Sequence, residues 1–348
     1  MSRARLKIIF IGTPDFAVPI LEKLIKSDYK PVLVITAPDK SVGRKQIVTP
    51  PPAKLVAEKF NIPIFQPQEI KNQISKIKNL KPDLIVVAAY GQILPKKILG
   101  IPKYGCLNIH PSLLPKYRGP SPIQYAILNG DEETGVTIIL MNEKVDAGPI
   151  ISTYNLQLTT YNYTYEELEK KLAELGAKLL IETIPKWTKG EIQPQPQDES
   201  EATYTKILKK EDGRIDWKKS AEEIERQIKA FNPEPGTYTK IQNSKCKSQN
   251  ENSKCKIFKI YKATVLPCKI KKRVGEAFLT EDGKLAVACG LVRRLRRPKA
   301  TSSAEGRSLG EGGKDALLLE EIQPEGKRKM TAQEFLRGHQ DIIGKTLN

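Results

Sequence analysis

Three nearly uninterrupted apolar runs in the first half of the chain restrict its fold most strongly. They are KIIFIG (Lys7–Gly12), PVLVITA (Pro31–Ala37) and PDLIVVAAYG (Pro82–Gly91). Strands that are buried on both faces of a parallel sheet have this composition. Between them, residues 16–27 and 51–61 place apolar side chains at helical spacing. The order β-α-β-α-β predicts an α/β fold with a doubly wound parallel sheet, whose ligands bind beyond the carboxyl ends of the strands.

The pattern changes in the second half of the chain. An amphipathic helix is predicted over Thr164–Trp187, and residues 189–206 are then rich in Pro and Gln without a hydrophobic period, which is typical of an extended linker. A helix over Ser220–Asn232 and several short apolar segments separated by turn residues follow, and they indicate a small antiparallel barrel. We therefore predict two domains, residues 1–188 and 207–348, on either side of the linker.

The charge of the chain is unevenly distributed. The net charge of the 348 residues is +18. Residues 1–206 contain 27 basic and 21 acidic residues, net +6, whereas residues 207–348 contain 31 and 19, net +12. This excess in the smaller part indicates a polyanionic partner there. A lysine-rich surface that contacts only water is the alternative that charge alone leaves open.

Several classes of function lack their sequence signatures. No apolar run reaches the roughly 18 residues of a membrane span, and the N-terminus does not resemble a signal peptide, so we expect a cytoplasmic protein. The five cysteines form no Cys-x-x-Cys pair, and with two histidines they offer no convincing zinc set. The turn FIGTPDFA has a single glycine, which makes a dinucleotide site a weak interpretation, and neither a P-loop nor a G-x-S-x-G motif is present.

The stretch LNIHPSLLPKYRG (Leu107–Gly119) carries the most chemical information. If its first four residues are extended, Asn108 and His110 point to the same side of the strand. Pro111 and Pro115 restrict the backbone beyond them, so the pair lies beside a stiff loop. A histidine whose hydrogen bonds are satisfied at a strand end is the alternative.

This motif, followed by the aspartate of KVDAGPI (Lys144–Ile150), resembles the folate-dependent formyltransferase superfamily. In that superfamily an Asn, a His and an Asp carry formyl transfer from 10-formyltetrahydrofolate, which implies catalytic roles for Asn108, His110 and Asp146. The loop after the histidine contacts the folate there. The resemblance therefore implies cofactor contacts from Ser112, Leu113, Leu114 and Pro115. For Asp146 alone, a turn-forming aspartate is the alternative.

Other stretches extend the resemblance over nearly the whole chain. IIFIGTPDFAVPIL, VVAAYGQILP and IQPEGKRKMTAQEFLRG are similar to the superfamily members that formylate initiator methionyl-tRNA for translation initiation. This implies a Rossmann-like catalytic domain and an OB-like β-barrel, and we expect a monomer whose barrel binds tRNA. GPSPIQ stands where the resemblance to these members leads us to expect a sequence like GAAPIQ. Two hydrophilic insertions, near residues 242–256 and 291–313, have no recognised counterpart.

The chemistry of formyl transfer suits the three polar side chains. When an amine attacks a formyl carbonyl, negative charge develops on one oxygen, and a protonated imidazole and an amide N–H stabilise it. His110 and Asn108 supply such donors. Asp146, if it is near His110, would hold the imidazolium and help to remove the amine proton, directly or through water. This scheme requires no metal.

Two alternatives remain at this level. In the first, the enzyme formylates a nucleotide-sugar amine instead of a tRNA. In the second, the chain is a nucleic-acid-binding protein whose catalytic domain has lost its activity. The basic C-terminal part argues against the first, and the intact set of Asn108, His110 and Asp146 argues against the second.

A basic loop follows the second apolar run. Residues 41–54 combine cations with a proline run and resemble the loop that this family inserts against the tRNA acceptor stem, which implies tRNA contacts from Arg44 and Lys45. Arg pairs well with phosphate and stacks on exposed bases, so Arg44 is the stronger candidate. A solvated loop is the alternative. The basic run Arg293–Lys299 lies in an insertion, and we interpret it as an auxiliary contact.

Overall fold

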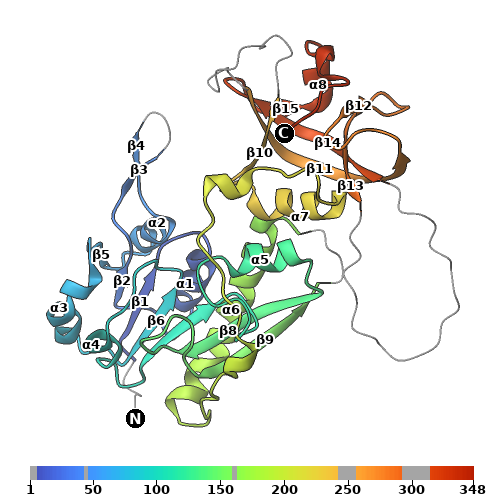
Figure 1. The fold of residues 1–348 in the computed structure, drawn as a ribbon. Helices are drawn as coiled ribbons and strands as arrows, with labels where there is room; N and C mark the ends of the chain where they lie inside the picture. Colours follow the sequence, from blue (N-terminus) through green and yellow to red (C-terminus); the bar gives the residue numbers. More distant parts are fainter. Residues whose placement is uncertain (1–5, 43–45, 159–162, 242–255, 292–313) are drawn as a thin grey trace, which may run out of the picture. The chain divides into compact units, whose positions relative to one another are not determined.

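The computed structural model describes residues 6–42, 46–158, 163–241, 256–291 and 314–348 (Figure 1). The chain forms two compact units: residues 1–126 with 130–207, and residues 127–129 with 208–348. Arg44, Lys45, Arg293–Lys299 and most of both predicted insertions lie outside the described residues.

The first unit is built on a seven-stranded sheet in the order β5-β2-β1-β6-β7-β8-β9 (Figure 1). Its strands are β1 Ile8–Gly12, β2 Leu33–Ile35, β5 Ile64–Phe65, β6 Leu84–Ala88, β7 Cys106–His110, β8 Glu133–Leu140 and β9 Ile150–Gln157. The first five strands in this order are parallel, and every residue of β1, β2, β6 and β7 is buried, which confirms the prediction from the apolar runs.

The other two strands extend this sheet in the antiparallel sense. β8 pairs antiparallel with β7, and β9 pairs antiparallel with β8. Much of β9 is exposed, as expected of an antiparallel strand at a sheet edge. The doubly wound sheet is therefore mixed. A separate hairpin consists of β3 Lys40–Val42 and β4 Ile47–Thr49.

The helices of the first unit cover the sheet (Figure 1). They are α1 Ala17–Ile25, α2 Pro52–Lys59, α3 Ile74–Asn79, α4 Lys96–Leu99, α5 Pro122–Asn129, whose last three residues belong to the second unit, and α6 Tyr165–Thr188, with short 3-10 turns at Ile70–Asn72 and Glu199–Glu201. Thr164 caps α6, and its hydroxyl accepts from the Glu167 N–H. A Cβ atom at Gly176 of α6 would lie 2.8 Å from Ile109 Cγ2. Glycine therefore lets α6 pack closely against β7, the strand that carries Asn108 and His110.

The second unit contains an antiparallel sheet in the order β10-β11-β14-β13-β12, with β15 paired to β14. The bounds are β10 Thr237–Ile241, β11 Lys256–Ile270, β12 Ala277–Leu279, β13 Leu285–Leu291, β14 Lys314–Pro324 and β15 Met330–Thr331. The C-terminal residues pair with both ends of this sheet, Leu347 with Ile241 of β10 and Thr346 with Glu276 beside β12. This pairing closes the predicted small barrel.

Helix α7 (Ala221–Phe231) supplies one side of the core of the second unit. Ser220 caps it, and its apolar face packs with Trp217, Phe258 and Leu317 among the buried residues of the barrel. Helix α8 (Ala332–Leu336) and the 3-10 turns Lys210–Gly213 and Gln340–Ile342 complete the unit. Within the described residues, no helix combines the length and the apolar character needed to cross a membrane.

The segment that we interpreted as a linker pairs with the first unit. Residues 193–206, which we call the strap, form backbone bridges at two positions, Gln195 with Ile150 and Tyr204 with Arg118. The Gln195 and Ile150 backbones exchange two hydrogen bonds of 2.7 and 2.9 Å. Because backbone hydrogen bonds impose no side-chain period, a strap and a free linker look alike in sequence.

Candidate active site

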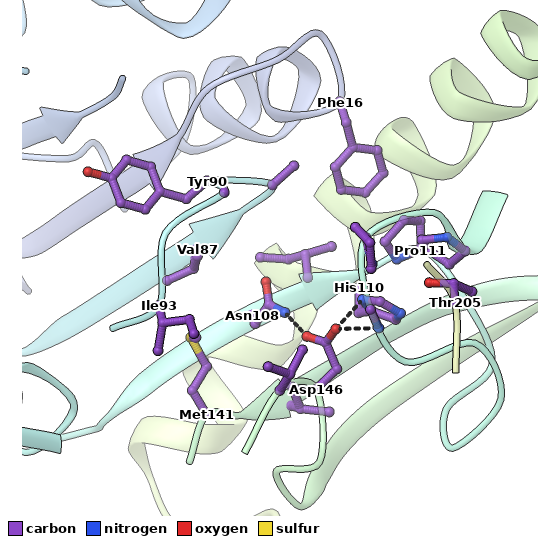
Figure 2. Close-up of a pocket in the computed structure, with 18 of the residues that line it drawn as sticks. Phe16, Val87, Tyr90, Ile93, Asn108, His110, Pro111, Met141, Asp146 and Thr205 are labelled. Carbon is purple, nitrogen blue, oxygen red and sulfur yellow. Dashed lines mark hydrogen bonds and ion pairs between the residues drawn. The ribbon is translucent and has the colours of Figure 1, made fainter. Parts of the chain in front are cut away.

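Asn108, His110 and Asp146 meet at the carboxyl end of β7 (Figure 2). Asn108 Nδ2 donates a hydrogen bond of 3.2 Å to Asp146 Oδ1, and His110 Nδ1 lies 3.6 Å from Asp146 Oδ2. Asn108 and His110 are buried, and the Asp146 side chain is 15% exposed. The structure thus brings together the three residues that the sequence singled out.

The backbone around Asp146 explains how its carboxylate reaches the pair on β7. Asp146 lies in the loop between β8 and β9 with a φ of 49°, in the left-handed region that Asp adopts more readily than most residues. The Gly119 N–H donates a hydrogen bond of 2.9 Å to Asp146 Oδ2. A Cβ atom at Gly148 would lie 1.9 Å from the Leu140 carbonyl oxygen, so this close turn requires glycine.

The two ring nitrogens of His110 have different partners. Nε2 lies 3.0 Å from the carbonyl oxygen of Tyr117. Because a carbonyl oxygen only accepts, we assign a hydrogen to Nε2. Nδ1 is at ion-pair distance from Asp146, beyond a normal hydrogen bond. In the imidazolium form, the Nδ1–H is therefore better placed than the Nε2–H to donate a hydrogen bond to an oxygen atom of a bound ligand.

These three residues line a pocket of about 800 Å³, a size typical of sites for small organic ligands. One wall is formed by the turn after β6, including Gly91 and the exposed Ile93, as expected for the ligand edge of the sheet. Phe16, Met141 and Thr205 also line the pocket (Figure 2). The sequence did not single out these three residues. Phe16 and Met141 resemble ordinary core residues at element ends, and Thr205 lies in the stretch that we interpreted as a linker.

The SLLP segment lies outside the lining of this pocket, although Pro111 contributes to it. Ser112 and Leu114 are buried. The Ser112 hydroxyl donates 2.7 Å to the Lys116 carbonyl oxygen, and the Leu114 N–H donates 3.2 Å to Thr137 Oγ1. Leu113 packs against β8 at Gly135. The contacts of Ser112, Leu113 and Leu114 therefore hold the loop against the sheet, and a folate contact from any residue of SLLP stays a prediction.

Tyr165 and Glu169 of α6 line the same pocket and were missed by sequence reasoning. The Tyr165 hydroxyl donates a 2.6 Å hydrogen bond to Glu169 Oε1. Burial raises the pKa of Glu169, and the hydrogen bond from Tyr165 opposes that shift. In sequence, Glu169 looks like one more acid on the polar face of a charged helix. Among the described residues, no three His, Cys, Asp or Glu side chains are grouped as metal ligands.

Gly119 illustrates how closely the strap approaches the site. Its φ is +107°, and an added Cβ would lie 2.9 Å from the Thr205 carbonyl oxygen. We expect Gly119→Ala to lower the free energy of unfolding by about 1–3 kcal/mol, measured by denaturant unfolding, because it combines backbone strain with a steric clash. Gly190→Ala is the control, since Gly190 also has positive φ but no atom within 4 Å of an added Cβ. Equal losses in both variants would show that the clash is unimportant.

Comparison with known proteins identifies relatives of both units. Residues 6–184 match the family described as formyl transferase, and residues 207–340 match the formyl transferase C-terminal domain. The methionyl-tRNA formyltransferase of Bacillus velezensis is 42% identical over 345 residues, covering 97% of this chain and 98% of the relative. That of Bacillus subtilis is 41% identical over 343 residues, covering 98% and 97%.

Solved structures of lower identity share the fold. The N-formyltransferase of Helicobacter canadensis, solved with folinic acid and dTDP-3-aminofucose, has a TM-score of 0.61 at 20% identity, covering 90% of this chain and 99% of that one. HypX of Aquifex aeolicus, solved with tetrahydrofolic acid, has a TM-score of 0.58 at 17% identity, covering 97% and 47%. With both of its units matched and full-length relatives at this identity, the chain belongs to the formyl transferase family, together with the methionyl-tRNA formyltransferases.

Proposed function

We propose that this chain is an enzyme that transfers the formyl group of 10-formyltetrahydrofolate to the α-amino group of methionine on initiator methionyl-tRNA. The full-length relatives of 42% and 41% identity, which are named methionyl-tRNA formyltransferases, support formyl transfer to methionyl-tRNA. The observation that carries it is the convergence of Asn108, His110 and Asp146 in one pocket.

The proposed roles follow from the positions of the donors. The amine attacks the formyl carbon of 10-formyltetrahydrofolate, and the bond from that carbon to N10 breaks when the tetrahedral intermediate collapses. The proton that the amine gives up balances the proton that N10 takes up. Asn108 Nδ2 and His110 Nδ1 donate toward the carbonyl oxygen, where negative charge develops. Asp146 holds the imidazolium form of His110 and accepts the proton of the attacking amine, directly or through water. An α-amino group has a reference pKa near 8, so a strong base is unnecessary and positioning matters more.

The pocket fits the proposed co-substrate in size and character. Its volume of about 800 Å³ and the apolar Val87, Ile93 and Met141 in its lining suit a ligand with flat rings. The Helicobacter canadensis and Aquifex aeolicus structures were solved with folates, which supports a folate in this fold. We retain Ser112, Leu113, Leu114 and Pro115 as proposed folate contacts that form when the ligand binds.

We also propose that residues 1–188 carry catalysis and residues 207–348 bind tRNA. The net charge of +12 on the second part supports an electrostatic contact with the phosphate backbone. The proposed enzyme is a monomer and acts in the cytoplasm.

The function is tested by a transfer assay. 10-Formyltetrahydrofolate labelled in the formyl carbon is incubated with the protein and charged initiator tRNA, and the aminoacyl group is then released and analysed. We expect labelled N-formylmethionine, formed only when the tRNA is charged. No labelled product at an enzyme concentration equal to that of the tRNA would contradict the proposal.

Arg44 and Lys45 are the proposed tRNA contacts of the first unit, on the basis of sequence. We expect Arg44→Ala to lower kcat/KM for charged tRNA about tenfold or more, because a hydrogen-bonded charge contact is lost. Folate binding should be nearly unchanged. Lys97→Ala, at an exposed cation of α4, is the control for loss of one positive charge. Equal losses for tRNA and folate in Arg44→Ala would indicate a folding defect.

A further inference from the structure

The side chain of Gln197 in the strap connects two loops that surround the candidate active site. Its Nε2 donates hydrogen bonds of 2.8 Å to the Asp146 carbonyl oxygen and 2.7 Å to the Gly148 carbonyl oxygen. Its Oε1 accepts hydrogen bonds of 3.0 and 2.8 Å from Nε and Nη2 of Arg118. Both ends of the amide are therefore used, and a flipped amide would lose all four bonds.

Arg118 holds the second of these loops, the one between β7 and α5. It is only 1% exposed, and a buried guanidinium is costly unless its donors are paired. Beyond Gln197, it donates to both carboxylate oxygens of Glu199 at 2.9 and 3.0 Å and to the Tyr204 hydroxyl at 3.2 Å. The Glu199 carboxylate raises the pKa of Arg118, and the guanidinium lowers the pKa of Glu199. The strap thus supplies all these partners of Arg118.

The hydrogen bonds of Gln197 and of the loop that contains Arg118 hold Asp146 in place. Its φ of 49° is uncommon for a residue other than glycine, and such a conformation persists only where the surroundings hold it. Gln197 holds the backbone carbonyl of Asp146 itself. The N–H of Gly119, the residue after Arg118, holds its carboxylate. The network therefore sets where the carboxylate meets Asn108 and His110.

We propose that Gln197 and Arg118 are positioning residues for formyl transfer, held by the strap, which keep the Asp146 carboxylate directed at Asn108 and His110. This inference rests on the proposed function. Neither side chain lines the pocket, so both act through Asp146 and not on the substrates.

The first test is Gln197→Glu, a substitution of nearly the same size. It keeps an acceptor for Arg118 but places a carboxylate oxygen against the Asp146 and Gly148 carbonyls, where the amide donated. We expect kcat to fall about tenfold to a hundredfold, since small misplacements at a reacting centre have effects of this size. KM for folate and for charged tRNA should change by less than about threefold.

Gln195→Glu is the matched control in the same strap. The Gln195 side chain is exposed, and within the part of the chain that the structure describes its amide donates only to the Gln193 carbonyl oxygen of the strap. Its pairing with Ile150 uses the backbone. The control therefore has the same change of charge without loss of a bond to the Asp146 loop. We expect its kcat to stay within about twofold of the parent value.

The second readout is the ring ¹⁵N chemical shift of His110 at fixed pH, which reports on its hydrogen bonds independently of turnover. The chain has two histidines, and the other, His339, lies in the second unit and serves as an internal reference. We expect Gln197→Glu to move the His110 signals and to leave those of His339 in place. Gln195→Glu should move neither.

Gln197→Ala repeats both measurements without a new charge and carries the test if Gln197→Glu is poorly folded. Unchanged kcat and His110 shifts in a folded Gln197 variant would overturn the proposal. It would also be overturned if kcat and both KM values worsened in step with the melting temperature while the His110 shifts stayed constant, because that would indicate a purely structural role. A parent protein without transfer activity would refute the proposed function, whereas the His110 shifts would still decide whether Gln197 positions Asp146.

Discussion

Replacing Asp146 with Asn is expected to lower kcat for formyl transfer by about a hundredfold or more, with little change in KM for charged tRNA. The substitution nearly preserves the size of the side chain and an oxygen for the Gly119 N–H. It removes the negative charge that faces His110 Nδ1 at 3.6 Å. In the proposed mechanism, that charge holds the imidazolium that stabilises the developing oxyanion, and it accepts the proton of the amine. Loss of the charge should therefore raise the free energy of the transition state more than it weakens substrate binding.

The two proposed hydrogen-bond donors to the oxyanion, His110 and Asn108, are also expected to act mainly in the transition state. His110→Ala should depress kcat to a similar extent, and Asn108→Ala should cost about a hundredfold, as loss of one oxyanion donor typically does. Asp83→Asn is the control, because Asp83 precedes the amino end of β6. Among the described residues, its carboxylate accepts only from the Lys7 N–H, a bond that an amide oxygen retains. Should the loss in the Asp146, His110 and Asn108 variants be confined to KM for tRNA, their catalytic assignment is wrong.

Removing the second unit, with a chain end after Ile207, is expected to keep folate binding and to lower tRNA affinity by about a hundredfold or more at low salt. The candidate site and its pocket are formed by residues of the first unit alone. Residues 207–348 carry a net charge of +12, and contacts with phosphates release counterions. The lost affinity should therefore be the salt-sensitive part. The log–log slope of affinity against salt should fall by roughly 0.7 to 0.9 for each phosphate contact removed.

The intact protein provides the reference slope, and folate binding by the shortened chain shows that the first unit is folded. If the shortened chain bound tRNA with the affinity and salt dependence of the whole protein, the basic surface of the second unit would contact only water.

The features that the sequence predicted are those with a simple period. The apolar runs predicted the buried parallel strands, and the two-residue period of an extended strand was enough to place Asn108 and His110 on one face of β7. Spacing did not predict that Asp146 joins them. That expectation came from resemblance to a family, because its approach depends on a turn with positive φ and on Gly148.

The features that sequence reasoning missed depend on contacts without a pattern. The strap is held by backbone hydrogen bonds, so a Pro- and Gln-rich stretch concealed both its pairing and the contacts of Gln197. Arg118 was part of the recognised motif, but its partners lie 79 to 86 residues further along the chain. Glu169 and Tyr165 were hidden for a similar reason, since a helix with many charges does not reveal which of them faces a pocket.

Formyl transfer to initiator methionyl-tRNA is tested most directly by a comparison of acceptors under one set of conditions. With 10-formyltetrahydrofolate as donor, kcat/KM is measured for charged initiator tRNA, charged elongator methionyl-tRNA and a dTDP-amino sugar, for the parent protein and for Asp146→Asn. We expect a clear preference for the charged initiator tRNA over the amino sugar, and loss of that activity in Asp146→Asn. A parent protein that formylates the amino sugar as well as or better than the tRNA, or an Asp146→Asn variant with full activity, would contradict it.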